Sequence, residues 1–311
     1  MEKKILITVE GSATTMATLA YVAMMEAAAI PDLSVMLFHV MKGVPPELRR
    51  ESNSCPHSHR LVASLEEREL AAASQLLDKA KEQLMAYGLE PEQVEVKLHP
   101  RVAGLARDIL FEAERGLYDA VVLGRRGSNR LQEVLLGSVT NKVVQHADRT
   151  PVWVVGDQVT SHRVLCAVDG SADSLRTVDH MAFMLGGNPR CEVTLFHVGA
   201  NLTNFRRPEL APGADLDLEA ELAALDHRRM SEFTEQALNI LAEGGVRPSQ
   251  VRTVINPGAG SVSRAILVEA RRGDYGTVVL GRRGQGQSFF LGHVSDRVVR
   301  KGAELAVWVV G

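Results

Sequence analysis

The sequence predicts an α/β fold made of two tandem modules, each a five-stranded parallel sheet with helices on both faces. Three observations support this class. The chain has 311 residues, and single domains usually have about 100 to 200, so two domains are expected. Short apolar runs alternate with longer segments of helix-forming residues. Five sequence blocks also occur twice, in the same order.

The repeated blocks indicate that one module is written twice. The copies are KILITVEGS and RVLCAVDGS, VMLFHV and VTLFHV, YDAVVLGRRG and YGTVVLGRRG, LLGSVTNKVV and FLGHVSDRVV, and PVWVVG and AVWVVG. The spacing between the copies drifts only from 159 to 155 residues, which excludes a chance match. We therefore expect domains at residues 1–157 and 158–311, joined at the polar segment GDQVTSH.

Within each copy, apolar runs predict the strands and longer segments predict the helices. ILITV, VMLF, AVVLG and VWVV lack polar alternation, which is typical of strands covered on both faces. Between them, residues 14–30, 64–88 and 104–116 have helix-forming composition, and GSVTNKVV begins a last helix near Ser138 or Thr140. This alternation predicts right-handed crossovers and a parallel sheet, whose ligands bind at the carboxyl ends of the strands.

Composition and charge narrow the functional classes. A formal net charge of −3 argues against a general nucleic-acid binder, which usually has a basic surface. Three cysteines do not form an even disulfide framework, so a reducing compartment is expected. The apolar segment 16–30 contains Glu26 and is shorter than the roughly 20 residues that cross a membrane. With no visible export signal, we expect a cytoplasmic protein that has no membrane partner.

A glycine-rich stretch follows the fourth strand of each copy. In the first copy, nine residues separate Gly127 from Gly137, and the pattern runs from Gly124 to Ser138. Glycine lets the backbone come close to a ligand, and the N–H groups at the start of a helix form an anion site suited to phosphates. The stretch matches neither the Walker-type loop nor the dinucleotide pattern G-x-G-x-x-G.

This glycine pattern, the VEGS and VDGS turns after the first strand and FHV at the end of the second resemble the universal stress protein family in its tandem form. The resemblance covers nearly the whole chain. It implies a Rossmann-like fold similar to adenine-nucleotide α-hydrolases, a role in the stress response and the binding of adenine nucleotide. It also implies pairing through the last strands, which carry Trp153 and Trp308, as a pseudo-dimer within one chain. A further homo-oligomer is left open.

The resemblance also implies which residues hold the nucleotide. In the first copy they are Val9, Glu10, Val40, Leu123, Gly124, Gly127, Gly137, Ser138, Val139 and Thr140. In the second copy they are Val168, Asp169, Val198, Leu280, Gly281, Gly284, Gly292, His293, Val294 and Ser295.

The two copies depart from the family pattern in different places. Glu10 stands where the family usually has Asp, and it is longer by one methylene. The second glycine stretch has seven residues instead of nine between its last two glycines, and His293 replaces a serine. We therefore expect ATP in the first domain, with Mg2+ as a candidate companion. In the second domain we expect AMP, ADP or no ligand.

Two groups of basic and reactive side chains have alternative interpretations. One arginine of each pair, Arg125–Arg126 and Arg282–Arg283, either contacts phosphate or is a solvated loop charge or salt-bridge partner of a neighbouring helix. The segment CPHSH offers Cys55 and two histidines, but a zinc site usually needs a second such cluster. A surface loop over residues 41–60 is therefore expected, and no metal site.

The recurring histidines and tryptophans are interpreted as structural. His39 and His197 end the second strands, where a structural hydrogen bond is expected, and the two tryptophans are expected in the core or at an interface. Asp119 has only Gly276 at the equivalent position, so it is not expected to be a general base. We therefore predict no catalytic residue.

Three functions remain from this sequence. The first is a regulatory or sensing protein that binds adenine nucleotide without dedicated turnover. The second is a slow ATPase or an autophosphorylating enzyme. The third is a nucleotide-free scaffold that binds a partner protein through its helices and the 41–60 segment.

Overall fold

The computed structural model describes residues 2–11, 13–26, 32–52, 54–125, 136–199, 214–257, 260–282 and 291–311. These residues form one ten-stranded sheet with the order β3-β2-β1-β4-β5-β10-β9-β6-β7-β8. We call β1 to β5 and their helices the first module, and β6 to β10 and theirs the second module. Each module has the same strand order, and all strands within it are parallel. The predicted fold class is confirmed.

Among the described residues, each element of the second module has a counterpart in the first, which also contains the short helix α2. The first module contains β1 (Lys3–Thr8), α1 (Ala13–Met25), β2 (Leu33–Val40), α2 (Pro46–Ser52), α3 (Pro56–Ala86), β3 (Val94–His99), α4 (Leu105–Gly116), β4 (Ala120–Gly124), α5 (Ser138–His146) and β5 (Val152–Val155). The second contains β6 (Arg163–Val168), α6 (Ala172–Leu185), β7 (Glu192–Val198), α7 (Ala214–Glu243), β8 (Val251–Asn256), α8 (Val262–Arg272), β9 (Thr277–Gly281), α9 (His293–Lys301) and β10 (Ala306–Val310). A single 3-10 turn precedes β3 (Pro91–Gln93) and another precedes β8 (Pro248–Gln250).

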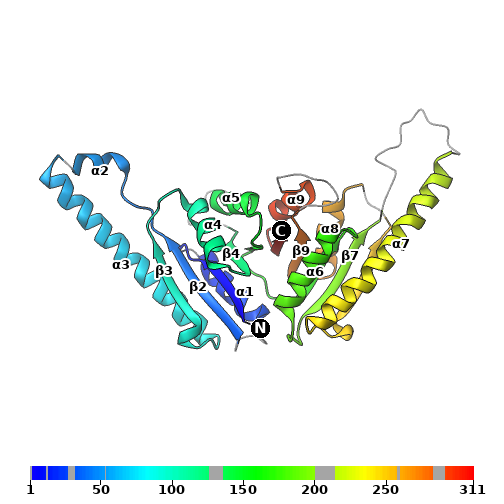
Figure 1. The fold of residues 1–311 in the computed structure, drawn as a ribbon. Helices are drawn as coiled ribbons and strands as arrows, with labels where there is room; N and C mark the ends of the chain where they lie inside the picture. The colour runs from blue at the N-terminus through cyan, green and yellow to red at the C-terminus, as the bar shows by residue number, and fades with distance from the viewer. Residues whose placement is uncertain are drawn as a thin grey trace.

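Helices cover both faces of the sheet. On one face, apolar side chains of the sheet pack against α1, α3, α6 and α7. On the other face they pack against α4, α5, α8 and α9. Figure 1 shows the two modules side by side, with the long helices α3 and α7 at the outer flanks. Because both faces are covered there, the central strands β4, β5, β9 and β10 are nearly continuous buried apolar runs, whereas the outermost strands β3 and β8 carry exposed polar residues.

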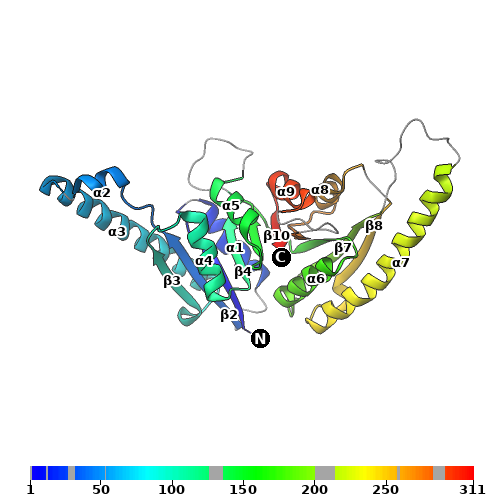
Figure 2. The same cartoon turned by 45° about the horizontal axis from the view of Figure 1, so that its top comes forward.

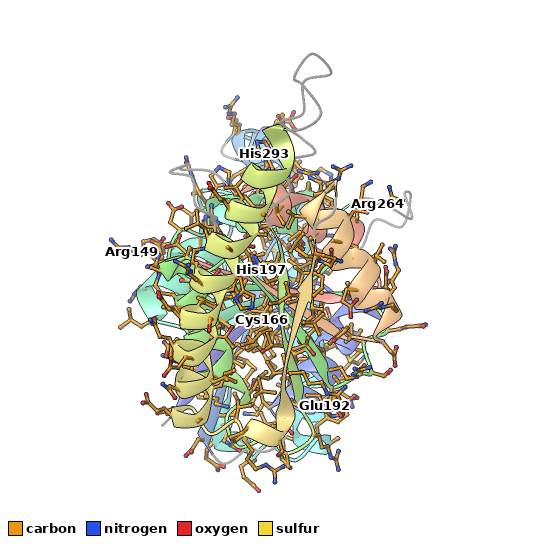
Figure 3. The ribbon with its side chains drawn as sticks, turned by 90° about the vertical axis from the view of Figure 1, so that its right-hand side faces the viewer. Arg149, Cys166, Glu192, His197, Arg264 and His293 are labelled. Atoms are coloured by element: carbon orange, nitrogen blue, oxygen red, sulfur yellow. The ribbon has the colours of Figure 1, made fainter. Side chains whose placement is uncertain are left out.

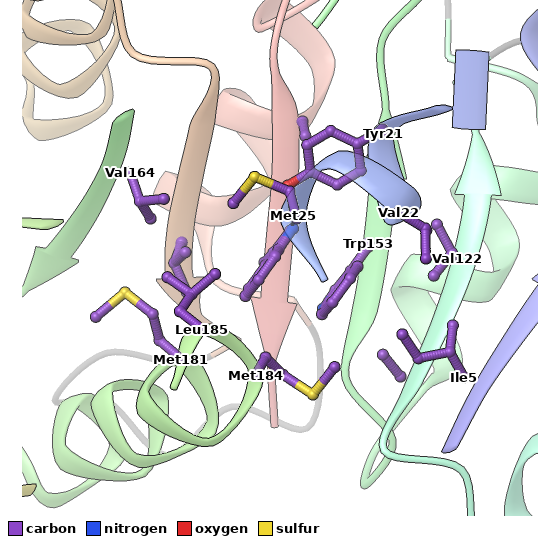
Figure 4. Close-up of a cluster of buried hydrophobic side chains, with 14 of the residues drawn as sticks. Ile5, Tyr21, Val22, Met25, Val122, Trp153, Val164, Met181, Met184 and Leu185 are labelled. Carbon is purple, nitrogen blue, oxygen red and sulfur yellow. Dashed lines mark hydrogen bonds between the residues drawn. The ribbon is translucent and has the colours of Figure 1, made fainter. Parts of the chain in front are cut away.

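The two modules meet through their last strands, as predicted. β5 and β10 pair antiparallel, with Trp153 opposite Trp308. The two indole rings are stacked, with centroids 3.8 Å apart and planes 1° from parallel. Both tryptophans are fully buried, in the cluster that Figure 4 shows around Tyr21 and Trp153. The antiparallel pair joins the two five-stranded halves into one sheet.

Each tryptophan donates its N–H to a side chain of the opposite module. Trp153 Nε1 donates to His180 Nε2 at 3.4 Å, and Trp308 Nε1 donates to the Tyr21 hydroxyl at 2.8 Å. Tyr21 lies on α1 and His180 at the equivalent position of α6. The contacts therefore follow the duplication, with a different acceptor on each side.

The segment before α3 differs from the sequence expectation. Residues 41–60 were expected to be a surface loop, but they contain α2 and the first turn of α3. α3 begins with Pro56, which fits the first turn of a helix because its missing N–H has no partner to lose there. The helix then continues to Ala86, and Gly88 follows with a φ of 103°. None of the helices formed by the described residues is long and apolar enough to span a membrane.

Candidate functional site

The fold places those predicted site residues of the first module that the structure describes at the carboxyl ends of its strands. β1 lies between β2 and β4, so the strand order reverses beside it, and in open α/β sheets ligands bind at the carboxyl ends of the strands at such a point. Val9 and Glu10 follow β1, and the Val9 N–H donates to Phe38 O at 2.9 Å. Val40 ends β2, while Leu123 and Gly124 end β4.

The glycine-rich stretch of the first module returns to the end of β4. The Gly137 N–H donates to Arg125 O at 3.0 Å, and Thr140 Oγ1 donates to Gly124 O at 3.0 Å. α5 begins immediately afterwards at Ser138, with Gly137 as the capping residue and no side-chain cap. The first backbone N–H groups of a helix lack intrahelical partners, so this turn can accept an anion. Val139 lies in the same turn.

Position 124 has little room for a side chain because α1 passes close to it. A Cβ added to Gly124 would lie 3.0 Å from Thr14 Cβ and 3.1 Å from Thr14 Oγ1. Gly127, the next glycine of the predicted pattern, lies outside the described residues, as does its counterpart Gly284.

Glu10 is half-buried just after the carboxyl end of β1. Burial raises the pKa of its carboxyl above the usual value, and the nearby charges of His39 and Lys42 partly oppose this. His39 Nδ1 donates to Val9 O at 2.6 Å, so the expected structural hydrogen bond of this histidine is confirmed. In the described part of the chain, no donor is bound to the Glu10 carboxylate.

The second module repeats the closure of the glycine-rich stretch. The Gly292 N–H donates to Arg282 O at 2.9 Å, and Ser295 Oγ donates to Gly281 O at 2.7 Å. α9 begins at His293, and Figure 3 shows His293 toward the upper end of the second module, where Arg264 of α8 also lies. Val168 ends β6, Val198 ends β7, Leu280 precedes Gly281 in β9, and Val294 lies in the first turn of α9.

The acid of the second module is bound within its own turn. Asp169 Oδ1 accepts from the Ser171 N–H at 3.0 Å, from Ser171 Oγ at 2.5 Å and from Ser174 Oγ at 2.7 Å. Ser171 also caps α6, because its side chain accepts from the Ser174 N–H. Asp169 and Glu10 therefore occupy equivalent positions with different hydrogen bonding.

Two residues of α7 at this end of the second module escaped the sequence analysis. His197 Nδ1 donates to Val168 O at 2.9 Å, and its Nε2 lies 2.8 Å from Asp226 Oδ2. Asp226 in turn accepts from Arg229. A Cβ at Gly170, where φ is +76°, would meet Arg229 Nε at 3.0 Å. Nothing in the sequence of α7 singles out these residues, because only the packing of the helix brings them over the turn after β6.

The expectation that Arg125 or Arg282 contacts phosphate is not supported. Both side chains are almost completely buried, and they point away from their own modules into the opposite one. They bind backbone carbonyls at helix ends there, so they are neither solvated charges nor phosphate ligands. Arg126 and Arg283 lie outside the described residues.

Other singled-out residues lie away from the carboxyl ends of the strands or at the surface. Asp119 Oδ2 accepts from the Lys4 N–H at 2.7 Å at the opposite edge of the sheet, before β4 begins. Cys55, His57 and His59 are exposed at the start of α3. Among the described residues, no three His, Cys, Asp or Glu side chains are grouped as a metal site would require.

A separate groove lies along α8 in the second module. Its volume is about 830 Å³, and its lining includes Phe196, Val254, Asn256, Arg264 and Glu269. None of the predicted site residues lines it.

Comparisons with known proteins agree with the duplicated fold. The model of the family described as "Universal stress protein family" matches residues 1–156 and 160–311. A universal stress protein from Archaeoglobus fulgidus DSM 4304 is 20% identical, with a TM-score of 0.64, covering 99% of this chain and 97% of that one. A putative universal stress protein from Pseudomonas aeruginosa UCBPP-PA14 is 15% identical, with a TM-score of 0.55, covering 99% and 93%. These two similarities show a shared fold. Among curated protein sequences, none matches this chain significantly.

Proposed function

Because this chain belongs to the universal stress protein family, we propose that it is a cytoplasmic stress-response protein that binds adenine nucleotide in a regulatory or sensing role. The region at the carboxyl ends of β1, β2 and β4 is the proposed nucleotide site of the first module. The equivalent edge of β6, β7 and β9 is that of the second.

One observation carries this proposal. In both modules the last glycine of the stretch donates to the residue after the fourth strand, which places the start of a helix beside the strand ends. The hydrogen bonds from Thr140 and Ser295 to the same strand ends hold this arrangement. A helix start held against the strand ends in this way suits a phosphate group, and the apolar residues Val9 and Val40 suit a nucleoside.

We propose that ATP binds the first module and that the second takes AMP or ADP or stays empty. Glu10 has no bound donor among the described residues, so its carboxylate is available to a nucleoside hydroxyl. Asp169 already accepts three hydrogen bonds at Oδ1, which fix its carboxylate to its own turn. Mg2+ is proposed only as a companion of the ATP phosphates.

A matched pair of variants tests this assignment. Gly137→Val and Gly292→Val each place a branched side chain at the start of the phosphate-facing helix, one in each module. We expect Gly137→Val to weaken ATP binding at least tenfold in calorimetry, and Gly292→Val to leave it within about twofold. Full ATP affinity in Gly137→Val would refute the assignment.

The same samples separate the alternatives. Chromatography of the nucleotide after each titration shows whether ATP is converted, which a slow ATPase would do and a sensor would not. Any conversion is expected to lie far below the typical enzyme median of about 10 per second. A chain that binds neither ATP nor AMP would instead favour the scaffold.

A further inference from the structure

Arg125 and Arg282 cross from one module into the other. Arg125 Nη1 donates to Val299 O at 2.5 Å and to Gly302 O at 3.2 Å, and its Nη2 donates to Arg300 O. Each of these acceptors lies at the carboxyl end of α9, so one guanidinium binds the whole last turn of that helix.

Arg282 makes the mirror set of contacts. Its Nη1 donates to Val144 O at 2.7 Å and to Ala147 O at 2.8 Å, and its Nη2 donates to Gln145 O. These carbonyls end α5 of the first module. Figure 2 shows α5 and α9 on either side of the join between the modules. Arg125 and Arg282 are each only 2% exposed.

Helix ends explain why two buried cations are stable here. The last carbonyls of a helix have no intrahelical partner and carry a negative partial charge. A guanidinium offers five donors spread over a rigid plane, so two of its nitrogens reach carbonyls on different sides of the helix end, whereas an ammonium is a single compact charge. One carboxylate also lies beside Arg282, because Asp148 Oδ1 is 3.6 Å from its Nη2.

Each arginine is fixed in its own module by its backbone. The Arg125 N–H donates to Val155 O at 2.9 Å, and its carbonyl accepts from Gly137. The Arg282 N–H donates to Val310 O, and its carbonyl accepts from Gly292. The main chain of each arginine therefore binds the last glycine of the stretch in its own module. Its side chain binds the helix that follows the glycine-rich stretch of the opposite module.

We propose that Arg282 is a positioning residue for the nucleotide site of the first module, and Arg125 for that of the second. The inference rests on the proposed function. α5 and α9 have nine residues each, so each helix is about 13 Å long. The first turn of each helix is the proposed phosphate site, and the last turn binds the guanidinium of the opposite module. Without the guanidinium, the carboxyl end of the helix is no longer held, so the helix can tilt on the sheet. The N–H groups of its first turn then move as well. Each site thus depends on a residue of the other module.

The main test removes the guanidinium and reads the opposite site. In a Gly292→Val background, where only the first site can act, Arg282→Met should weaken ATP binding at least tenfold in calorimetry. Lys142→Met is the matched control, because it removes one exposed cation from α5 without touching the last turn. It should leave the affinity within twofold. ATP affinity within twofold in Arg282→Met overturns the proposal.

Amide hydrogen exchange in the ligand-free protein gives a second reading. The first intrahelical bonds are the Asn141 N–H to Gly137 O in α5 and the Asp296 N–H to Gly292 O in α9. Arg282→Met should speed exchange at Asn141 and not at Asp296, and Arg125→Met should do the reverse.

The outcomes separate this inference from the proposed function. Faster exchange confined to the last turn, with Asn141 and Asp296 unchanged, would mean that the arginines are only helix caps. If the unmodified chain binds no nucleotide, the proposed function fails, while the exchange at Asn141 still decides the positioning role. If Arg282→Met does not fold, Arg282→Lys replaces it under the same criteria, because lysine keeps the charge but not the planar, spread-out set of donors.

Discussion

At the scale of single residues, the two modules use different side chains for the same contact across the join. Tyr21 and His180 occupy matching positions and accept from the tryptophan of the other module. Burial raises the pKa of Tyr21 and lowers that of His180, to about 3, so His180 stays neutral in the folded protein at neutral pH. An unfolded histidine has a pKa near 6.5.

This depressed pKa predicts a loss of stability in acid. Below about pH 6.5 the unfolded chain takes up a proton at His180 that the folded chain excludes until about pH 3, so the free energy of unfolding falls as the pH drops. His180→Tyr, which copies the residue of the first module, should reduce that loss between pH 7 and 4.5 by on the order of 2 kcal/mol. Urea unfolding at both pH values measures it. The unmodified chain, unfolded in parallel, is the reference; an equal loss of stability between the two pH values in His180→Tyr and in the unmodified chain would contradict the prediction.

At the scale of elements, the sequence predicts those strands and helices that have a clear apolar pattern. It does not predict features that depend on packing between distant segments. The strands and the start of α5 follow from apolar runs and from Gly137. The early start of α3 at Pro56 could not be read from composition, because its first turns are polar and exposed. The roles of Arg125 and Asp226 depend on segments distant in sequence, so no local pattern reports them.

Two helices that are not equivalents of each other, α6 and α5, begin in different ways, which gives a contrasting pair of variants. Ser171 caps α6 with its side chain, whereas α5 has no side-chain cap. Ser171→Ala should lower the free energy of unfolding by about 1 kcal/mol. Ser138→Ala, at the first position of α5 where the serine is exposed, should change it by less than about 0.5 kcal/mol in the ligand-free protein. Denaturant midpoints of the two variants measure this, and a reversed order would show that the Ser171 cap adds no stability.

At the scale of the whole molecule, the linker adds little to what already joins the modules. The β5–β10 pair, the stacked tryptophans and the six arginine hydrogen bonds all cross the join. Lys3 adds a buried contact, because its ammonium bonds Glu26 at 2.9 Å and Met184 O at 2.6 Å. Each of these contacts is buried or nearly so, which is typical of a permanent interface.

Cutting the linker should therefore leave one particle. A protease site inserted after Gln158, in the exposed part of the linker, would allow the folded chain to be nicked. We expect the two fragments to elute together in size-exclusion chromatography at micromolar concentration. Adding Arg125→Met and Arg282→Met to the nicked chain should promote separation. Fragments that separate without these changes would show that the interface is weak.

The join between the modules also bears on how such a chain can change over generations. In a symmetric dimer of identical subunits, every interface substitution appears twice and must suit both halves at once. Once the halves are fused, one side of a matched contact can mutate while its twin stays unchanged. Two pairs of equivalent positions show this freedom. Tyr21 of the first module corresponds to His180 of the second, and the ion pair Lys3–Glu26 corresponds to His162 and Leu185. Fusion thus lets two copies of one gene segment inherit separate specialisations while the shared sheet keeps them together.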